Sequence, residues 1–108
     1  MLEPASVRQA LGLSRERMGR VLDVSAKTVE RWEGHGGSVP DPVRRAALER
    51  VQAVIDLART VYGDDGFRAF LTTPQRRFDG RSPQRLLESG DVDRLLGALA
   101  GDYEGLGH

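Results

Sequence analysis

The sequence predicts an all-α protein in which a bundle of short helices is joined by a long helix to a small helical C-terminal domain. Two observations lead to this fold class. Apolar residues recur at spacings of three and four along most of the 108 residues, which is the period of an α-helix. A Ser or Asp before most of the apolar runs and a Gly after most of them mark where helices begin and end. The expected boundaries are residues 1–40, 41–63 and 64–108.

The first expected helix runs from residue 4 to residue 11, with apolar residues at three-four spacing and Gly12 as its stop signal. Two short helices joined by a tight turn are then expected within residues 15–34. Met18 and Leu22 share one face of the first, while Val29 and Trp32 share one face of the second. The pattern therefore indicates two short helices that pack against each other.

The turn between these two helices has suitable residues at each position. Gly19 would allow a close approach of the second helix, and Asp23 is a residue type that tolerates the left-handed backbone conformation. Val24 is expected to pack between the helices, and the Ser25 hydroxyl can accept an unpaired N–H of the next helix.

The polar residues of the second helix lie away from its Val29/Trp32 face and near its N-terminus, where unpaired N–H groups favour contact with phosphate. Lys27 and Arg31 can reach phosphates or guanine edges, and Thr28 can reach a phosphate or a thymine methyl group. The residues expected to contact DNA are Arg15, Ser25, Ala26, Lys27, Thr28 and Arg31.

This stretch resembles the Cro/Xre-type helix-turn-helix, through Gly19, Val24, Ser25 and the run T-V-E-R-W-E that follows. The family usually has glycine where this chain has Asp23. The resemblance covers about the first third of the chain and implies binding to double-stranded operator DNA. Because one recognition helix makes few contacts, we expect a homodimer, or a higher complex with a partner, on a palindrome. The alternative is a helical hairpin that only packs.

A long helix is expected after Asp41-Pro42, a capping residue followed by a proline at the first helical position. Its apolar stripe continues to Tyr62, and Gly63 is its expected end. The stripe comprises Leu48, Val51, Val54, Ile55, Ala58, Val61 and Tyr62. The helix could connect the two units, pair with its copy in a dimer, or serve as an ordinary core helix.

Shorter elements are expected in the C-terminal domain. A turn at residues 64–66 would precede a short helix with Phe67, Phe70 and Leu71 on one face, followed by an irregular link over residues 75–81. Ser82-Pro83 opens the next helix, and Asp91 opens the last, whose stripe is Val92, Leu95, Leu96, Leu99 and Ala100. Gly101 is expected to end this helix, leaving residues 102–108 as a tail with little fixed structure.

The C-terminal half resembles the toxin-binding domain of the MbcA/ParS/Xre antitoxin family. The run F-L-T-T-P comes first, and the most specific part is G-x-S-P-x-x-L-L-x-S-G over residues 80–90. The family commonly has tryptophan near Phe70 and leucine near Phe78, so size and apolarity are kept but identity is not. The alternative is a helical domain that dimerises a repressor.

The resemblance implies a non-enzymatic antitoxin that neutralises a RES-type, NAD-consuming toxin and represses its own promoter. The residues expected to bind the toxin are Arg77, Arg81, Arg85, Asp102, Tyr103, Glu104, Leu106 and His108. The tail could enter the toxin's active-site cleft, or it could be a frayed terminus. A stand-alone phage-type repressor without a toxin is the second reading, and an interaction module without DNA binding is the third.

Composition excludes several other classes. The chain has no cysteine, 16 basic and 16 acidic residues, and histidine only at His35 and His108, so we expect no catalytic site, cofactor or metal. Residues 1–62 carry a net charge of +2, and residues 63–108 carry a net charge of −2. The positive charge of the N-terminal part suits contact with DNA. Without a signal peptide or membrane span, we expect a cytoplasmic protein.

Overall fold

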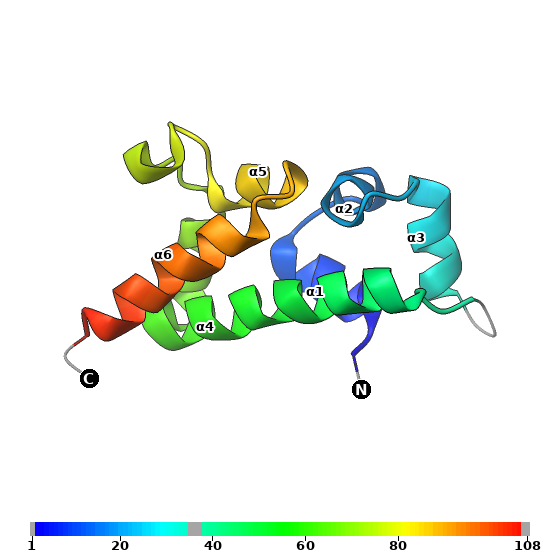
Figure 1. The fold of residues 1–108 in the computed structure, drawn as a ribbon, viewed down its shortest axis with the longest axis horizontal. Coiled ribbons are helices and arrows are strands. Elements are labelled where there is room, and N and C mark those ends of the chain that lie inside the picture. Colours follow the sequence, from blue (N-terminus) through cyan, green and yellow to red (C-terminus); the bar gives the residue numbers. More distant parts are fainter. Residues whose placement is uncertain (1, 35–37, 107–108) are drawn as a thin grey trace.

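The computed structural model describes residues 2–34 and 38–106, and within these ranges all the regular segments are helices (Figure 1). The all-α prediction is confirmed. The helices are α1 (Pro4–Leu11), α2 (Arg15–Leu22), α3 (Ala26–Glu33), α4 (Pro42–Thr72), a 3₁₀ helix (Arg76–Phe78), α5 (Pro83–Glu88) and α6 (Val92–Glu104). A single antiparallel bridge joins Gln75 to Arg81 around the 3₁₀ helix.

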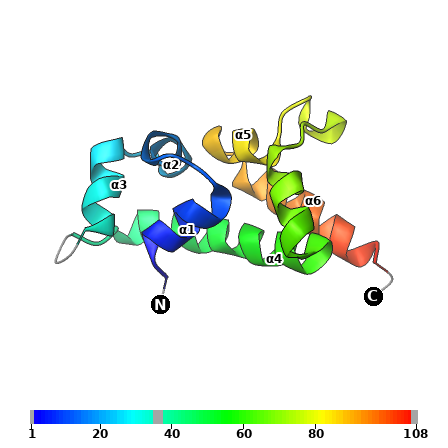
Figure 2. The same cartoon turned by 180° about the vertical axis from the view of Figure 1, so that it is seen from behind.

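Helix α4 runs along the long axis of a molecule that measures 45 × 27 × 24 Å (Figures 1 and 2). Helices α1, α2 and α3 gather at its N-terminal half, and α5 and α6 gather at its C-terminal half. We call α1–α3 the front lobe and residues 73–106 the rear lobe. One continuous apolar core, from Val7 in α1 to Leu99 in α6, lies between both lobes and α4.

Capping side chains begin four of the helices at the expected residues. Ser14, Ser25, Asp41 and Ser82 each accept a hydrogen bond from the backbone N–H three residues further on. Asp91 precedes α6 as expected, but its side chain makes no capping hydrogen bond.

Gly63 interrupts the long helix where its end was expected, whereas the turn expected directly after it was wrong. Gly63 is the one non-helical residue inside α4, with φ 75° and ψ 172°, and residues 64–66 are helical rather than a turn. A residue without a side chain can absorb this bend, so the helix resumes at once in a new direction. The bend lets Phe67, Phe70 and Leu71 enter the core.

The end of α6 also differs from the expectation. The helix continues through Gly101 to Glu104, so Asp102, Tyr103 and Glu104 are helical rather than part of a loose tail. Leu95 and Leu99 are buried as expected, whereas Ala100 is exposed and does not belong to the buried stripe. Helix α6 continues past Gly101 because side chains of other elements hold Asp102.

Candidate functional site

Helices α2 and α3 are joined by a tight turn. Asp23 adopts the left-handed conformation, with φ 57° and ψ 49°, and the Val24 N–H donates to the Gly19 carbonyl at 2.9 Å. A Cβ atom on Gly19 would clash with the Val24 carbonyl oxygen. Gly19 and Asp23 therefore have the roles in the turn that the sequence predicted.

The outer edge of α3 carries the predicted DNA-contacting residues. Lys27 and Arg31 are exposed, while Val29 on the opposite face is buried. The Arg31 Nη2 donates to Thr28 Oγ1 at 3.2 Å, and Thr28 Oγ1 lies 3.0 Å from the Ser25 hydroxyl. These contacts hold the Arg31 guanidinium toward the N-terminal end of α3, where the helix favours anions.

Arg15, Ala26 and Lys27 meet beside this edge. They line an open hollow of about 560 Å³ together with Ser14 and Glu30. Arg15 is half-exposed and also contacts Glu33 Oε1 at 3.2 Å, so its guanidinium is shared with a carboxylate of α3. The structure thus brings Arg15, which the sequence predicted to bind phosphate, close to the start of α3.

Glu33 was not predicted from the sequence, although it fixes α3 to α1 within the front lobe. Its carboxylate accepts from Arg8 Nε at 2.7 Å and from Arg8 Nη2 at 3.0 Å. The hydrogen bonds from Arg8 lower the pKa of Glu33, and those from Arg15 add to the effect. The pair spans 25 positions, and nothing in the local pattern indicates it.

A second cluster lies where the rear lobe meets α4 next to its bend. Arg77 makes a bidentate contact with Asp102, at 2.8 and 2.9 Å, and the Tyr62 hydroxyl donates to the same carboxylate at 2.6 Å. The hydrogen bonds from Arg77 lower the pKa of Asp102, whereas burial, followed by contact with Asp102, raises that of Tyr62. Asp102 and Arg77 are therefore engaged with each other rather than free for a partner.

The other predicted partner-binding residues are spread over the rear lobe. Arg81 lies 3.5 Å from Asp91, and Arg85 is exposed on α5. At the end of α6, Tyr103 is 37% exposed and Leu106 is 53% exposed. Glu104 is exposed as well. His108, like the loop residue His35, lies outside the described residues.

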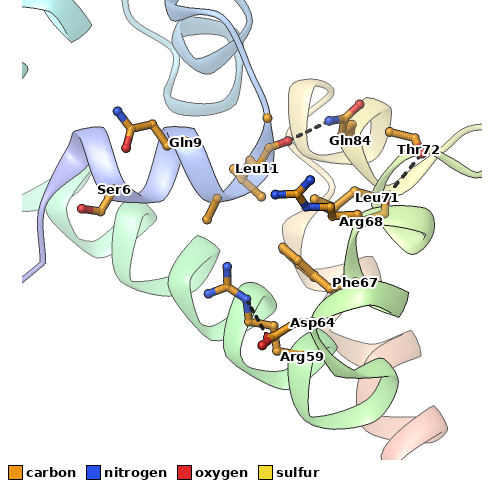
Figure 3. Close-up of a pocket in the computed structure, with 12 residues that line it drawn as sticks. Ser6, Gln9, Leu11, Arg59, Asp64, Phe67, Arg68, Leu71, Thr72 and Gln84 are labelled. Carbon is orange, nitrogen blue, oxygen red and sulfur yellow. Dashed lines mark hydrogen bonds and ion pairs between the residues drawn. The ribbon is translucent and has the colours of Figure 1, made fainter.

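A cleft of about 780 Å³ lies where α1, α4 and α5 meet (Figure 3). Arg59 and Arg68 line it, and Phe67 lies between them. At one end, Gln84 Nε2 donates to the Leu11 carbonyl at 2.7 Å, which ties α5 to the end of α1. None of the residues that the sequence predicted to bind DNA or a toxin lines this cleft.

Glu88 joins the two lobes directly and was also missed. Its buried carboxylate accepts from Arg17 at 2.7 Å and from Arg20 at 3.0 Å, both on α2. The hydrogen bonds from Arg17 are the main cause of the lowered pKa of Glu88. The rear lobe is therefore fixed to α2.

Residues 2–34 and 38–106 contain no group of three or more His, Asp or Glu side chains placed to hold a metal ion. No helix in these ranges has the length and apolar character required to cross a lipid bilayer.

Comparisons with known proteins point to one class of relative. No protein-family model matches the chain. The chain is 29% identical over 98 residues to the "Mycobacterial cidal antitoxin MbcA" of Mycobacterium tuberculosis, and equally to that of Mycobacterium bovis, covering 91% of this chain and 86% of each relative. Its fold matches a chain in the crystal structure of the M. tuberculosis MbcT–MbcA toxin–antitoxin complex, with a TM-score of 0.68 and 27% identity. That match covers 96% of this chain and 93% of the other.

Proposed function

We propose that this chain, a homologue of the antitoxin MbcA, is itself the antitoxin of a toxin–antitoxin pair. The observation that carries the proposal is the extent of the similarity, which includes both lobes and the long helix between them. An antitoxin acts by binding its toxin. The role proposed here is accordingly not enzymatic.

The finer identity of the toxin rests on the resemblance of residues 80–90. In this run Ser82 caps α5, Leu86 and Leu87 are fully buried, and Gly90 has a positive φ of 83°. The motif thus builds the framework of the rear lobe, which supports its assignment as a toxin-binding domain. We accordingly propose a RES-type toxin that consumes NAD, acting with this chain in the cytoplasm.

The rear lobe offers a surface suited to a protein partner. Tyr103 and Leu106 present apolar groups at the end of α6, next to the exposed carboxylate of Glu104. Arg85 adds an exposed guanidinium on α5. We place toxin binding on this surface, with Arg77, Arg81 and Asp102 as the residues that hold its shape.

The front lobe supports a second activity, which is repression of the chain's own promoter. Lys27, Thr28 and Arg31 lie on the open edge of α3. A tight turn, with Asp23 in the left-handed conformation, precedes this helix. We propose that this edge enters the major groove of a palindromic operator as a homodimer or in a complex with the toxin.

Co-expression with the product of the adjacent open reading frame tests the antitoxin proposal. We expect the two proteins to co-purify, and we expect the toxin alone to arrest growth and deplete cellular NAD. Growth arrest that this chain does not relieve would contradict the proposal. A chain that shifts its upstream DNA in a gel but meets no partner would instead be a stand-alone repressor.

A further inference from the structure

The cleft between α1, α4 and α5 has no part in the activities proposed above. None of the described residues that line it belongs to α3 or α6. Its volume of about 780 Å³ lies within the range of small-molecule sites, which is roughly 300–1,000 Å³. We call it the bend cleft, and the lining residues that matter here are Gln9, Leu11, Arg59, Phe67, Arg68 and Leu71.

The bend cleft carries an excess of positive charge. Arg59 and Arg68 line it from the two segments of α4, and Asp64 is the one acidic residue among the described residues of its lining. The Asp64 carboxylate lies 3.8 Å from Arg59 Nε, and its side chain is 93% exposed. Within residues 2–34 and 38–106 the Arg68 guanidinium has no hydrogen-bonding or ion-pair partner. An anion in the cleft therefore competes for arginine only with one solvent-exposed carboxylate of this part of the chain.

The floor of the bend cleft is apolar. Leu11, Phe67 and Leu71 line it, and each of them is at most 3% exposed. The Arg59 guanidinium lies 4.9 Å from the centre of the Phe67 ring, a cation–π contact that holds this charge beside the floor. Phe67 lies between the two arginines (Figure 3). A fitting ligand thus combines an anionic group with a less polar body.

The α1 wall of the bend cleft adds a polar group. Gln9 is exposed on α1, and its amide can donate to a ligand or accept from one. The amide of Gln84 is already used, since its Nε2 donates to the Leu11 carbonyl at 2.7 Å and fixes α5 against α1. The cleft therefore has firm walls and one amide available for recognition.

We propose that the bend cleft binds a small organic phosphate of nucleotide size, with the phosphate at Arg59 and Arg68 and the organic part over the apolar floor. Guanidinium groups form paired, charge-assisted hydrogen bonds with phosphate, so two arginines suit this group. Inorganic phosphate would meet the arginines but leave the floor uncovered. The organic part supplies the apolar contact that the floor requires.

Such a ligand would contact elements of the whole molecule. The cleft is lined by α1 of the front lobe, by both segments of α4 around Gly63, and by α5 of the rear lobe. A ligand that binds only the folded chain stabilises it, so the midpoint of thermal unfolding should rise with ligand concentration. The inference goes beyond the proposed antitoxin function and does not depend on it.

Isothermal titration calorimetry of the full chain with AMP tests the site, with adenosine and inorganic phosphate as partial ligands. We expect saturable binding of AMP with a Kd below about 1 mM, and binding of each partial ligand at least about tenfold weaker. Absence of saturable AMP binding in this range, or a partial ligand that binds as tightly as AMP, would overturn the inference.

Arg68→Gln should weaken AMP binding at least about tenfold, since it removes the paired hydrogen bonds to phosphate. Arg76→Gln, which changes an exposed arginine outside the cleft, is the matched control and should bind AMP normally. Thermal unfolding without ligand should be the same for both variants and the wild type, because both side chains are exposed. Wild-type affinity of Arg68→Gln for AMP would overturn the inference.

Lys27→Ala distinguishes the bend cleft from the edge of α3, where phosphate could also bind. We expect this variant to bind AMP like the wild type. Loss of AMP binding in Lys27→Ala but not in Arg68→Gln would place the phosphate on α3 and overturn the inference. AMP binding that requires Arg68, in a chain that neither relieves a toxin nor binds its upstream DNA, would uphold the bend cleft and refute only the proposed function.

Discussion

At the scale of single residues, three carboxylates hold distant parts of the chain together. Glu33 binds Arg8, Glu88 binds Arg17 and Arg20, and Asp102 binds Arg77. In each case hydrogen bonds from arginine lower the pKa of the acid. These charge-assisted bonds act together with the apolar core to set the angles between the short helices.

The lowered pKa values predict how stability depends on pH. A carboxyl whose folded-state pKa lies below its unfolded value of about 4.3 stabilises the fold above that pH and stops doing so as pH falls through the folded pKa. We expect the free energy of unfolding to fall steadily below about pH 4.3. Urea titrations should show a flatter profile for Glu33→Gln/Glu88→Gln, whereas exposed Glu49→Gln should keep the wild-type profile. A steep profile in the double variant would contradict this assignment.

Gly19 and Gly97 offer a matched pair of glycine substitutions. Gly19→Ala should destabilise the protein by about 1–3 kcal/mol, because the new Cβ meets the Val24 carbonyl oxygen. Nothing lies near the Cβ that Gly97→Ala adds within α6, so this change should be neutral or stabilise by about 0.5–1 kcal/mol. Thermal unfolding distinguishes them, and equal effects would refute the close packing of the turn.

At the scale of elements, α3 and α6 present the two exposed edges on which the proposed activities depend. Helix α3 is short, and Ser25 and Glu33 hold its two ends. The exposed edge between these ends therefore stays accessible. Helix α6 is longer than the sequence indicated and is held at its last turn by Asp102. Each edge is therefore presented by a fixed helix rather than by a loop.

Lys27→Ala and Arg31→Ala should each weaken operator binding by about 1–3 kcal/mol where the side chains reach bases. Fluorescence anisotropy with labelled upstream DNA measures the loss. Arg68→Ala, an exposed arginine on the second segment of α4, is the control and should leave affinity unchanged. Wild-type affinity for both α3 variants would count against α3 as the reading helix.

Leu106→Ala should weaken inhibition of the toxin without changing the fold, since its side chain is 53% exposed and lies beyond the last turn of α6. We expect stability within about 0.5 kcal/mol of the wild type. Val39→Ala, an exposed apolar truncation at the other end, is the control and should inhibit normally. Titrating toxin activity with each variant gives the comparison, and equal inhibition would move the toxin surface away from the end of α6.

At the scale of the whole molecule, α4 and the Glu88 contacts make the two lobes one unit. The core cluster is continuous from α1 to α6, and α4 contributes to it along both of its segments. Gln84 and Glu88 of α5 add polar contacts to α1 and α2. A change in the rear lobe is thus coupled to the helix that supports α3.

This coupling predicts a single unfolding transition that Glu88→Gln lowers as a whole. Losing the charge-assisted bonds should cost about 1.5–3 kcal/mol. Fluorescence of Trp32, the single tryptophan, reports on the front lobe, and circular dichroism reports on all helices. The two midpoints should move together, while Glu49→Gln should move neither. Separate midpoints would show that the lobes unfold independently.

Much of the fold could be predicted because its signals are local. Caps at Ser14, Ser25, Asp41 and Ser82 lie directly before the helices they begin, and Asp23 needs only its own backbone conformation to form the turn. Helical spacing alone predicted which edge of α3 is exposed. The ion pairs of Glu33 and Glu88 did not, because they join residues 25 and 71 positions apart.

The sequence by itself determined the helices, their starting points and which face of each is apolar, since these depend on residues within a few positions of one another. Tertiary structure alone decided that a second helical segment follows Gly63 directly and that α6 runs to Glu104. In both places side chains from elsewhere, the core around Phe67 and the pair of Arg77 and Tyr62 on Asp102, stabilise a conformation that glycine leaves open in the isolated chain.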